Sequence, residues 1–311
     1  MSDIKKVAYV FPGQGAQTVG MGKDLYENFD SVKALFKQAD DAVGFQLTKI
    51  FFEGPEEELR KTSNAQPALV AVSFACLKAA QEVGGKNLPA ASFMAGHSLG
   101  EYTALAAANS IDFATAVFLA KERGRLMYEA GMKTAGSMMA MLGIEEAVLA
   151  EVCRETNTVI ANINSPGQLV ISGAAENITK AGELAKARGA SRAIPLQVSG
   201  AFHSPLMQPA VDGMTQILSK VTFNDPSVPI IANVTALLLT SGSQIKDELL
   251  EQLCNGVQWQ RSVEYMVQKG VSRFIEIGPG KVLTGLIKRI SRDVEIMNIG
   301  DVNAVKALVR G

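Results

Sequence analysis

Cysteine is scarce in this sequence, and so is any excess of charge. The three cysteines, Cys76, Cys153 and Cys254, stand far apart in apolar, helical-looking runs, which is poor material for a disulfide framework or a zinc site. The 30 Lys and Arg residues nearly balance 31 Asp and Glu, so the overall charge does not favour binding to nucleic acid or to a membrane surface. We therefore expect a protein of the reducing cytoplasm that binds no metal, nucleic acid or membrane.

Long apolar runs are missing as well. The most apolar longer stretch, residues 102–120, is interrupted by Asn109, Ser110 and Asp112, so it falls short of the roughly 20 apolar residues that a membrane span needs. The N-terminus lacks the apolar core of a secretory signal. We therefore expect a soluble protein.

The order of expected elements indicates an α/β protein with an insertion. Residues 137–198 read as strand, helix, strand, strand, helix, strand, which is the order of a ferredoxin-like domain. On either side, helices alternate with strands, and this predicts a mostly parallel sheet covered by helices. We place the small domain at residues 131–198 and the large one at residues 1–130 and 199–311.

Two proline positions are expected to interrupt the N-terminal helices. Between the first strand and residue 90, the sequence reads as helices broken at Gly54-Pro55 and at Gln66-Pro67, because proline disfavours the helix interior.

A serine between two glycines carries the strongest chemical signal. The segment Gly96-His97-Ser98-Leu99-Gly100 follows a short apolar run that suits a buried strand and precedes a stretch that reads as a helix. In that context Gly-x-Ser-x-Gly is the nucleophile elbow, a strained turn that exposes the serine hydroxyl. The helix that follows aims unpaired N–H groups at the place where an oxyanion would form, and the Leu99 N–H is the natural donor.

Only two histidines can supply the base that a serine nucleophile needs. His97 adjoins Ser98 in a tight turn, where consecutive side chains diverge, so it is interpreted as a packing or hydrogen-bonding residue. His203 precedes Ser204-Pro205, which reads as the N-cap and first position of a helix, and a helix N-terminus disfavours the imidazolium. We expect His203 to be the base, with a solvated or structural role as the alternative.

One arginine is expected on an apolar helix face. Asp112 reads as the N-cap of a helix that runs to about residue 130, and at about 100° per residue Arg123 falls within the apolar arc of that helix. A buried guanidinium requires an anion, and its planar fork matches a carboxylate. The anion can belong to a substrate or to a structural Asp or Glu.

Longer motifs along nearly the whole chain resemble a known family, the malonyl-coenzyme A:acyl carrier protein transacylases of dissociated fatty acid synthesis and the acyltransferase domains of polyketide synthases. The matching segments are residues 11–17, 66–69, 96–102, 123–124, 164–168, 201–203, 257–259 and 276–281. The resemblance implies an α/β-hydrolase-like large domain carrying a ferredoxin-like small one. It also implies malonyl transfer from malonyl-coenzyme A to acyl carrier protein through a malonyl-serine, with no cofactor because the coenzyme A thioester is the substrate.

The resemblance further implies roles for particular residues. Ser98 would be the nucleophile, His203 the base and Arg123 the partner of the malonyl carboxylate. The backbone N–H groups of Gln14 and Leu99 would form the oxyanion hole.

Four more positions follow from the same resemblance. The family orients its histidine with a backbone carbonyl, and the matching position is Gln258. Gln66 and Asn162 would line the pocket. Phe202 resembles the bulky aromatic of malonyl-selective forms, which crowds out an α-methyl group.

Two rival functions stay open at this point. A serine hydrolase shares the elbow, but it usually carries its histidine near the C-terminus, whereas residues 204–311 follow His203 here. A non-catalytic module that binds carrier protein would not need the serine, histidine and arginine together.

We expect a monomer whose contacts with an acidic carrier protein come from basic residues, each of which can instead be a solvated surface charge. The candidates are Lys121, Arg125, Lys281, Lys288 and Arg289.

Overall fold

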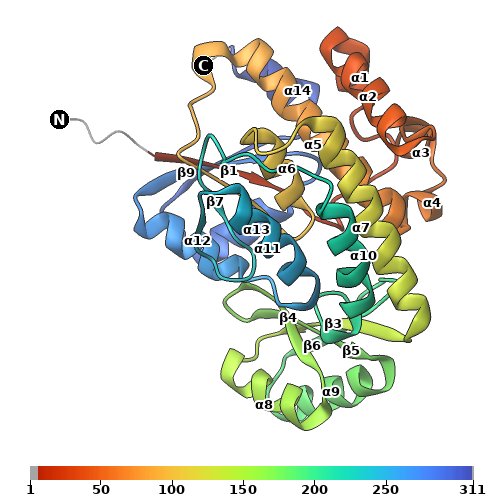
Figure 1. Cartoon of the computed structure of the whole chain (residues 1–311). Helices are drawn as coiled ribbons and strands as arrows, with labels where there is room; N and C mark the ends of the chain where they lie inside the picture. The colour runs from red at the N-terminus through yellow and green to blue at the C-terminus, as the bar shows by residue number, and fades with distance from the viewer. Residues whose placement is uncertain (1–5, 310–311) are drawn as a thin grey trace.

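The computed structural model describes residues 6–309, which form two sheets with helices around them (Figure 1). The six-stranded sheet consists of β1 (Lys6–Phe11), β2 (Phe93–Gly96), β7 (Ile230–Ile231), β8 (Leu238–Leu239), β9 (Val271–Ile277) and β10 (Glu295–Ile299). Its order is β10-β9-β1-β2-β7-β8, and only the β7–β8 pair is antiparallel. The predicted mostly parallel sheet is therefore confirmed.

Helices cover both faces of this sheet because the central strand β1 is apolar on both sides. Val7, Tyr9 and Phe11 belong to one hydrophobic cluster, whereas Ala8 and Val10 belong to another, as the alternation of a strand requires. The first cluster includes residues of α5 (Thr62–Gly84), α6 (Gly100–Ala107) and α7 (Phe113–Lys133), and the second includes residues of α12 (Trp259–Gln268) and α13 (Val282–Ile290).

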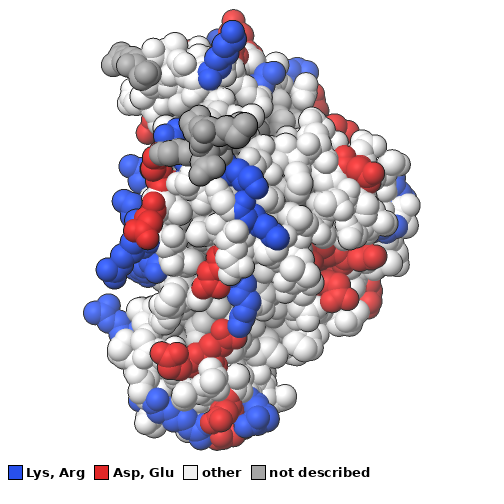
Figure 2. Space-filling model, turned by 90° about the vertical axis from the view of Figure 1, so that its left-hand side faces the viewer, with Lys and Arg blue, Asp and Glu red and all other residues white. Residues whose placement is uncertain are grey.

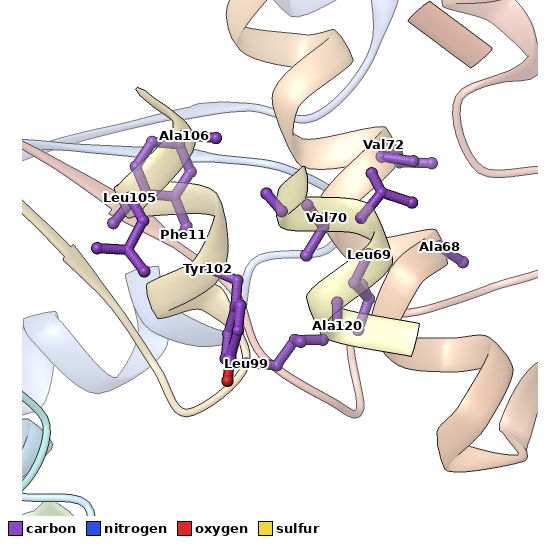
Figure 3. Packing of buried hydrophobic residues seen from close by; sticks show 14 of the residues in the cluster. Phe11, Ala68, Leu69, Val70, Val72, Leu99, Tyr102, Leu105, Ala106 and Ala120 are labelled. Carbon is purple, nitrogen blue, oxygen red and sulfur yellow. The ribbon is translucent and has the colours of Figure 1, made fainter. Parts of the chain in front are cut away.

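The first cluster reaches the candidate elbow. Leu99, Tyr102 and Leu69 are buried within it (Figure 3). The turn that carries Ser98 is therefore anchored in the main core of the molecule.

Helix α5 runs unbroken through Pro67, so the predicted break at Gln66-Pro67 is wrong. Proline removes one helical hydrogen bond and costs about 3 kcal/mol in a helix interior. Most residues of α5 up to Ala80 are buried, and this packing outweighs the loss. With the turn after it, α5 is also the one helix of residues 6–309 long and apolar enough to cross a membrane, and 67% of that apolar window is buried inside the protein. A core helix passes the same test.

The other helices of the large part complete the layers around the sheet. The predicted break at Gly54-Pro55 is confirmed, because it separates α3 from α4. These helices are α1 (Lys23–Asn28), α2 (Asp30–Val43), α3 (Leu47–Glu53), α4 (Glu56–Arg60), α10 (Gln208–Leu218), α11 (Gly242–Cys254) and α14 (Val302–Ala307), with 3-10 turns η1 (Gly85–Asn87) and η2 (Pro205–Met207).

The second sheet is the predicted ferredoxin-like unit, at the bottom of Figure 1. Its elements are β3 (Gly136–Leu142), α8 (Glu146–Thr156), β4 (Val159–Ser165), β5 (Gln168–Ala174), α9 (Ala175–Ala187) and β6 (Arg192–Pro195). The strands are antiparallel in the order β4-β5-β3-β6. The predicted domain limits at residues 131 and 198 bracket this sheet and stay a prediction.

The two sheets are joined by backbone contacts as well as by the chain itself. Ile163 N donates to Val257 O over 2.9 Å, and Val257 N donates to Ala161 O over 2.9 Å. Strand β4 is thereby tied to the segment before α12.

Candidate active site

Ser98 lies in a strained turn between β2 and α6. Its φ of 50° is in the left-handed region, which residues other than glycine rarely adopt. The flanking glycines have no room for a side chain: a Cβ on Gly96 would lie 1.9 Å from Gly100 C, and one on Gly100 would lie 2.1 Å from Phe11 O. The predicted elbow is therefore present, and the Leu99 N–H lies at the N-terminus of α6.

The backbone of the elbow is held by Asn233, which sequence reasoning missed. Asn233 Oδ1 accepts from Ser98 N over 2.7 Å, and Asn233 Nδ2 donates to Gly96 O over 2.8 Å. The residue is buried and follows the short strand β7, which is parallel to β2. The available signal was a polar residue at the carboxyl end of an apolar run, where side chains of parallel strands converge.

His203 is in hydrogen-bonding contact with the serine. Its Nε2 lies 2.8 Å from Ser98 Oγ, and its Nδ1 lies 2.7 Å from the backbone oxygen of Gln252. A carbonyl can only accept, so Nδ1 carries the proton and Nε2 is the basic nitrogen that faces the hydroxyl. Burial, followed by the charge of Arg123, lowers the pKa of His203 to about 3.

The expectation that Gln258 orients the histidine is wrong, because the carbonyl belongs to Gln252. Gln252 lies in the last turn of α11, where helical carbonyls have no partner within the helix. The carbonyl of Gln258 instead accepts from Ser262 N over 2.9 Å at the start of α12. The sequence could not distinguish two glutamines so close together without the position of the helix end.

Arg123 is 1% exposed and contacts only neutral acceptors. Nη1 donates to Gln66 Oε1 over 2.7 Å, and Nη2 donates to Gln252 Oε1 over 2.7 Å and to Ser98 Oγ over 3.1 Å. Its Nε–H finds no acceptor among the described residues, and within residues 6–309 no Asp or Glu forms an ion pair with it. Burial lowers the pKa of Arg123. Among the residues that the structure describes, the structural ion pair considered from the sequence is thus not formed.

A cavity of about 110 Å³ opens beside these groups. Its lining includes five of the predicted residues, Gln14, Ser98, Arg123, Asn162 and Phe202, besides His203. The lining residues are Gln14, His97, Ser98, Arg123, Met127, Met138, Asn162, Leu196, Val198, Phe202 and His203. Gln66 is not among them, so the prediction that it lines the pocket is wrong. Its Oε1 accepts from Arg123, and its Nε2 donates to Thr62 Oγ1.

His97 also lines this cavity, but its ring nitrogen contacts Asn164 and not Ser98. Its Nε2 lies 2.8 Å from Asn164 Oδ1, and its ring packs against Trp259 with centroids 5.5 Å apart. Both contacts fit the packing and hydrogen-bonding role expected from the sequence.

Comparisons with known proteins show the family that the chain is similar to. A family model described as "Acyl transferase domain" matches residues 8–305. A malonyl CoA-acyl carrier protein transacylase of Bacillus subtilis is 44% identical over 99% of this chain and 97% of the relative.

Solved structures give the same likeness. The crystal structure of an acyl carrier protein S-malonyltransferase from Vibrio cholerae has a TM-score of 0.93 and 42% identity, covering 98% of this chain and 100% of that one. A malonyl-transacylase in complex with a type II polyketide synthase (PKS) acyl-carrier protein has a TM-score of 0.93 and 42% identity, covering 99% of this chain and 100% of that one.

Proposed function

The chain belongs to the acyl transferase family, and we propose that Ser98, His203 and Arg123 are the groups with which it transfers malonyl from malonyl-coenzyme A to acyl carrier protein. The protein is an acyltransferase that supplies malonyl-acyl carrier protein for fatty acid synthesis. The transfer proceeds through a covalent malonyl-serine. It needs no metal or cofactor, because the thioester is already an activated acyl group.

The first half-reaction acylates the serine. His203 Nε2 takes the proton of Ser98 Oγ while that oxygen attacks the thioester carbonyl carbon. The oxyanion is stabilised by the N–H groups of Leu99 and Gln14. The carbon–sulfur bond then breaks, and the departing coenzyme A thiolate takes this proton from His203.

The second half-reaction reverses these proton transfers. The phosphopantetheine thiol of the carrier protein gives its proton to His203 and attacks the malonyl ester. The carbon–oxygen bond to Ser98 breaks, and Oγ recovers the proton. His203 thus acts as base and then as acid in both half-reactions.

The observation that carries the malonyl assignment is the buried guanidinium at the nucleophile. Within residues 6–309 Arg123 has no anionic partner of its own, and its Nη2 lies 3.1 Å from Ser98 Oγ. A malonyl group brings a carboxylate into that position, where a charge-assisted hydrogen bond orients the thioester. Asn162 and Phe202 line the same cavity, and the Phe202 ring would disfavour an α-methyl branch.

Intact-mass spectrometry after mixing with malonyl-coenzyme A tests the proposal. We expect a malonyl adduct on the parent protein, its transfer to added holo carrier protein, and no adduct on Ser98→Ala. Rapid release of free malonate, with no malonyl-acyl carrier protein formed, would instead identify a hydrolase.

The cellular location, the oligomeric state and the docking face belong to the same proposal. We place the protein in the cytoplasm as a monomer, and its contacts with carrier protein among Lys121, Arg125, Lys281, Lys288 and Arg289. Basic and acidic side chains are interspersed on the face shown in Figure 2, so docking would depend on a local cluster of basic residues.

A further inference from the structure

The side chain of Gln252 connects the substrate-binding arginine to a buried carboxylate. Its Oε1 accepts from Arg123 Nη2 over 2.7 Å, and its Nε2 donates to Ser98 O over 3.1 Å and to Glu101 Oε2. An amide presents oxygen on one side and N–H on the other. The orientation of this amide therefore decides whether Arg123 meets an acceptor or another donor.

Glu101 has an N–H donor at each of its two carboxyl oxygens. Oε1 accepts from the backbone N of Asn233 over 3.2 Å, and Oε2 accepts from Gln252 Nε2. The side chain is fully buried, in the first turn of α6, three residues after the nucleophile. A carboxyl group can accept at both of its oxygens and so satisfies these two donors, whereas a glutamine amide accepts at its oxygen alone. Burial, followed by the charge of Glu248, raises the pKa of Glu101.

We propose that Glu101 is a positioning residue for Arg123. By accepting from Gln252 Nε2, it fixes the amide with Oε1 toward the guanidinium, and the guanidinium is held where the acyl carboxylate must bind. Glu101 touches neither substrate nor the reacting atoms. The inference rests on the proposed malonyl transfer.

The isosteric substitution Glu101→Gln exposes this dependence. If the new amide keeps its oxygen on Asn233 N–H, its NH₂ meets Gln252 Nε2, and Gln252 must turn its own NH₂ toward Arg123. If the new amide turns over, its NH₂ meets Asn233 N–H, and the Gln252 contact survives at the expense of a buried donor pair. Either arrangement leaves one N–H without an acceptor, and the first places it against the arginine.

The test compares rates of acylation of Ser98 by malonyl-coenzyme A and by acetyl-coenzyme A, measured by intact mass on the whole protein. For Glu101→Gln we expect the malonyl-to-acetyl rate ratio to fall about tenfold, the effect of losing roughly one hydrogen bond to a charged group. Loss of folded protein would lower both rates together and leave the ratio unchanged.

Glu276→Gln is the matched control. Glu276 is also fully buried and accepts from Leu283 N, Thr284 N and Thr284 Oγ1, but it has no contact with Gln252 or Arg123. We expect this variant to keep the parent ratio, even if its thermal midpoint falls.

Two further variants keep the proposal open to refutation. In an Arg123→Ala background, Glu101→Gln should not change the ratio further, because the group it positions is gone. If Glu101→Gln does not fold, Glu101→Asp retains both acceptors but withdraws them by one methylene, and a smaller fall in the ratio is expected. A parent protein that is malonylated while Glu101→Gln and Glu101→Asp keep its ratio overturns the inference, whereas a parent that is never malonylated overturns the proposed function instead.

Discussion

Arg123 Nη2 lies 3.1 Å from Ser98 Oγ, in hydrogen-bonding contact. In a malonyl thioester, one methylene separates the carboxylate from the carbonyl carbon that a nucleophile attacks. An anion site for this acyl group must therefore lie next to the nucleophile. An arginine a few residues further along α7 would be too far from Ser98 to bind the carboxylate. The contact between the two side chains meets that requirement before any substrate binds.

The first prediction concerns Arg123→Ala. We expect acylation by malonyl-coenzyme A to fall about 10- to 100-fold relative to acylation by acetyl-coenzyme A, since a hydrogen bond to a charged group contributes about 1.5–3 kcal/mol. Initial rates of Ser98 adduct formation by intact mass measure both. Equal losses for the two acyl groups would remove the carboxylate role.

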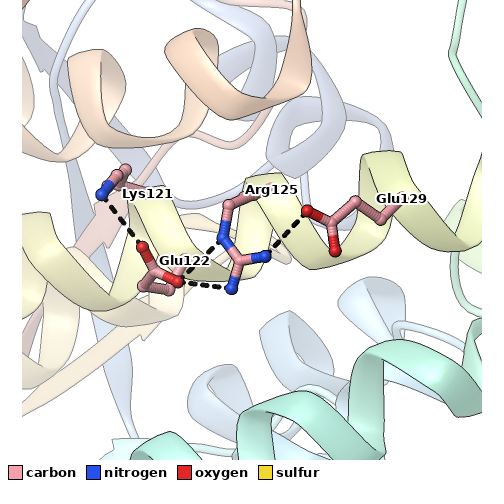
Figure 4. A network of polar contacts seen from close by, with 4 residues as sticks. All are labelled: Lys121, Glu122, Arg125 and Glu129. Carbon is pink, nitrogen blue, oxygen red and sulfur yellow. Dashed lines mark hydrogen bonds and ion pairs between the residues drawn. The ribbon is translucent and has the colours of Figure 1, made fainter.

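Arg125→Ala is the control for that experiment. Arg125 lies on the same helix, but it is half-buried and paired with the buried Glu122 and with Glu129, with Lys121 also on Glu122 (Figure 4). Glu122 keeps Lys121 as a partner when Arg125 is replaced, and Arg125 has no hydrogen bond to Ser98, His203 or Arg123. We expect its malonyl-to-acetyl ratio to match the parent in the absence of carrier protein.

The second prediction concerns pH. Burial first, and then the charge of Arg123, lower the pKa of His203 to about 3, so in the free protein its base form is lost only at acidic pH. Removing Arg123 takes away one of the lowering effects, so the pKa rises and protonation disables the base at a higher pH.

The measurement is the pH profile of kcat/KM with acetyl-coenzyme A for the parent and Arg123→Ala. The acid limb should move to higher pH in the variant. The buried Glu248 and Glu101, whose pKa values burial raises, to about 7 for Glu248, are present in both proteins, so the parent profile is the reference for the shift. Superimposable profiles would contradict the coupling of the two side chains.

The third prediction concerns the elbow glycines. A Cβ on Gly100 would lie 2.1 Å from Phe11 O, and a clash with backbone should destabilise Gly100→Ala by about 3 kcal/mol or more. Gly285→Ala is the counterpart, because a Cβ there meets nothing within 4 Å and the residue lies inside α13. The free energy of unfolding of Gly285→Ala should rise by about 0.5–1 kcal/mol. Denaturant unfolding measures both, and comparable destabilisation of the two would refute the steric argument.

Much of this fold could be predicted because local signals agreed with tertiary packing. The elbow lies between an apolar run and a helix, and Asp112 caps α7 by accepting from Thr115 N over 2.7 Å. The failure at Pro67 has the opposite origin, since burial of α5 overrode a local preference. Local sequence carries no record of how strongly a helix will be packed.

The site divides in the same way. Ser98, His203 and Arg123 are distinctive residue types in distinctive settings, so they could be proposed from the sequence. Asn233 and Gln252 are ordinary amides whose importance comes from where β7 and α11 end in space. Choosing Gln252 over Gln258 required the three-dimensional position of one helix terminus.

The last prediction separates support of the nucleophile from recognition of the acyl group. Asn233→Ala removes the acceptor of Ser98 N–H and the donor to Gly96 O, which leaves buried backbone groups unpaired at a cost of about 1–3 kcal/mol. The strained turn loses its brace, so acylation by malonyl- and acetyl-coenzyme A should fall together, whereas Arg123→Ala affects them unequally. Asn28→Ala, at an exposed position on α1, should leave both rates unchanged. A selective loss of malonyl transfer in Asn233→Ala would mean that Asn233 acts on the substrate carboxylate and not on the elbow.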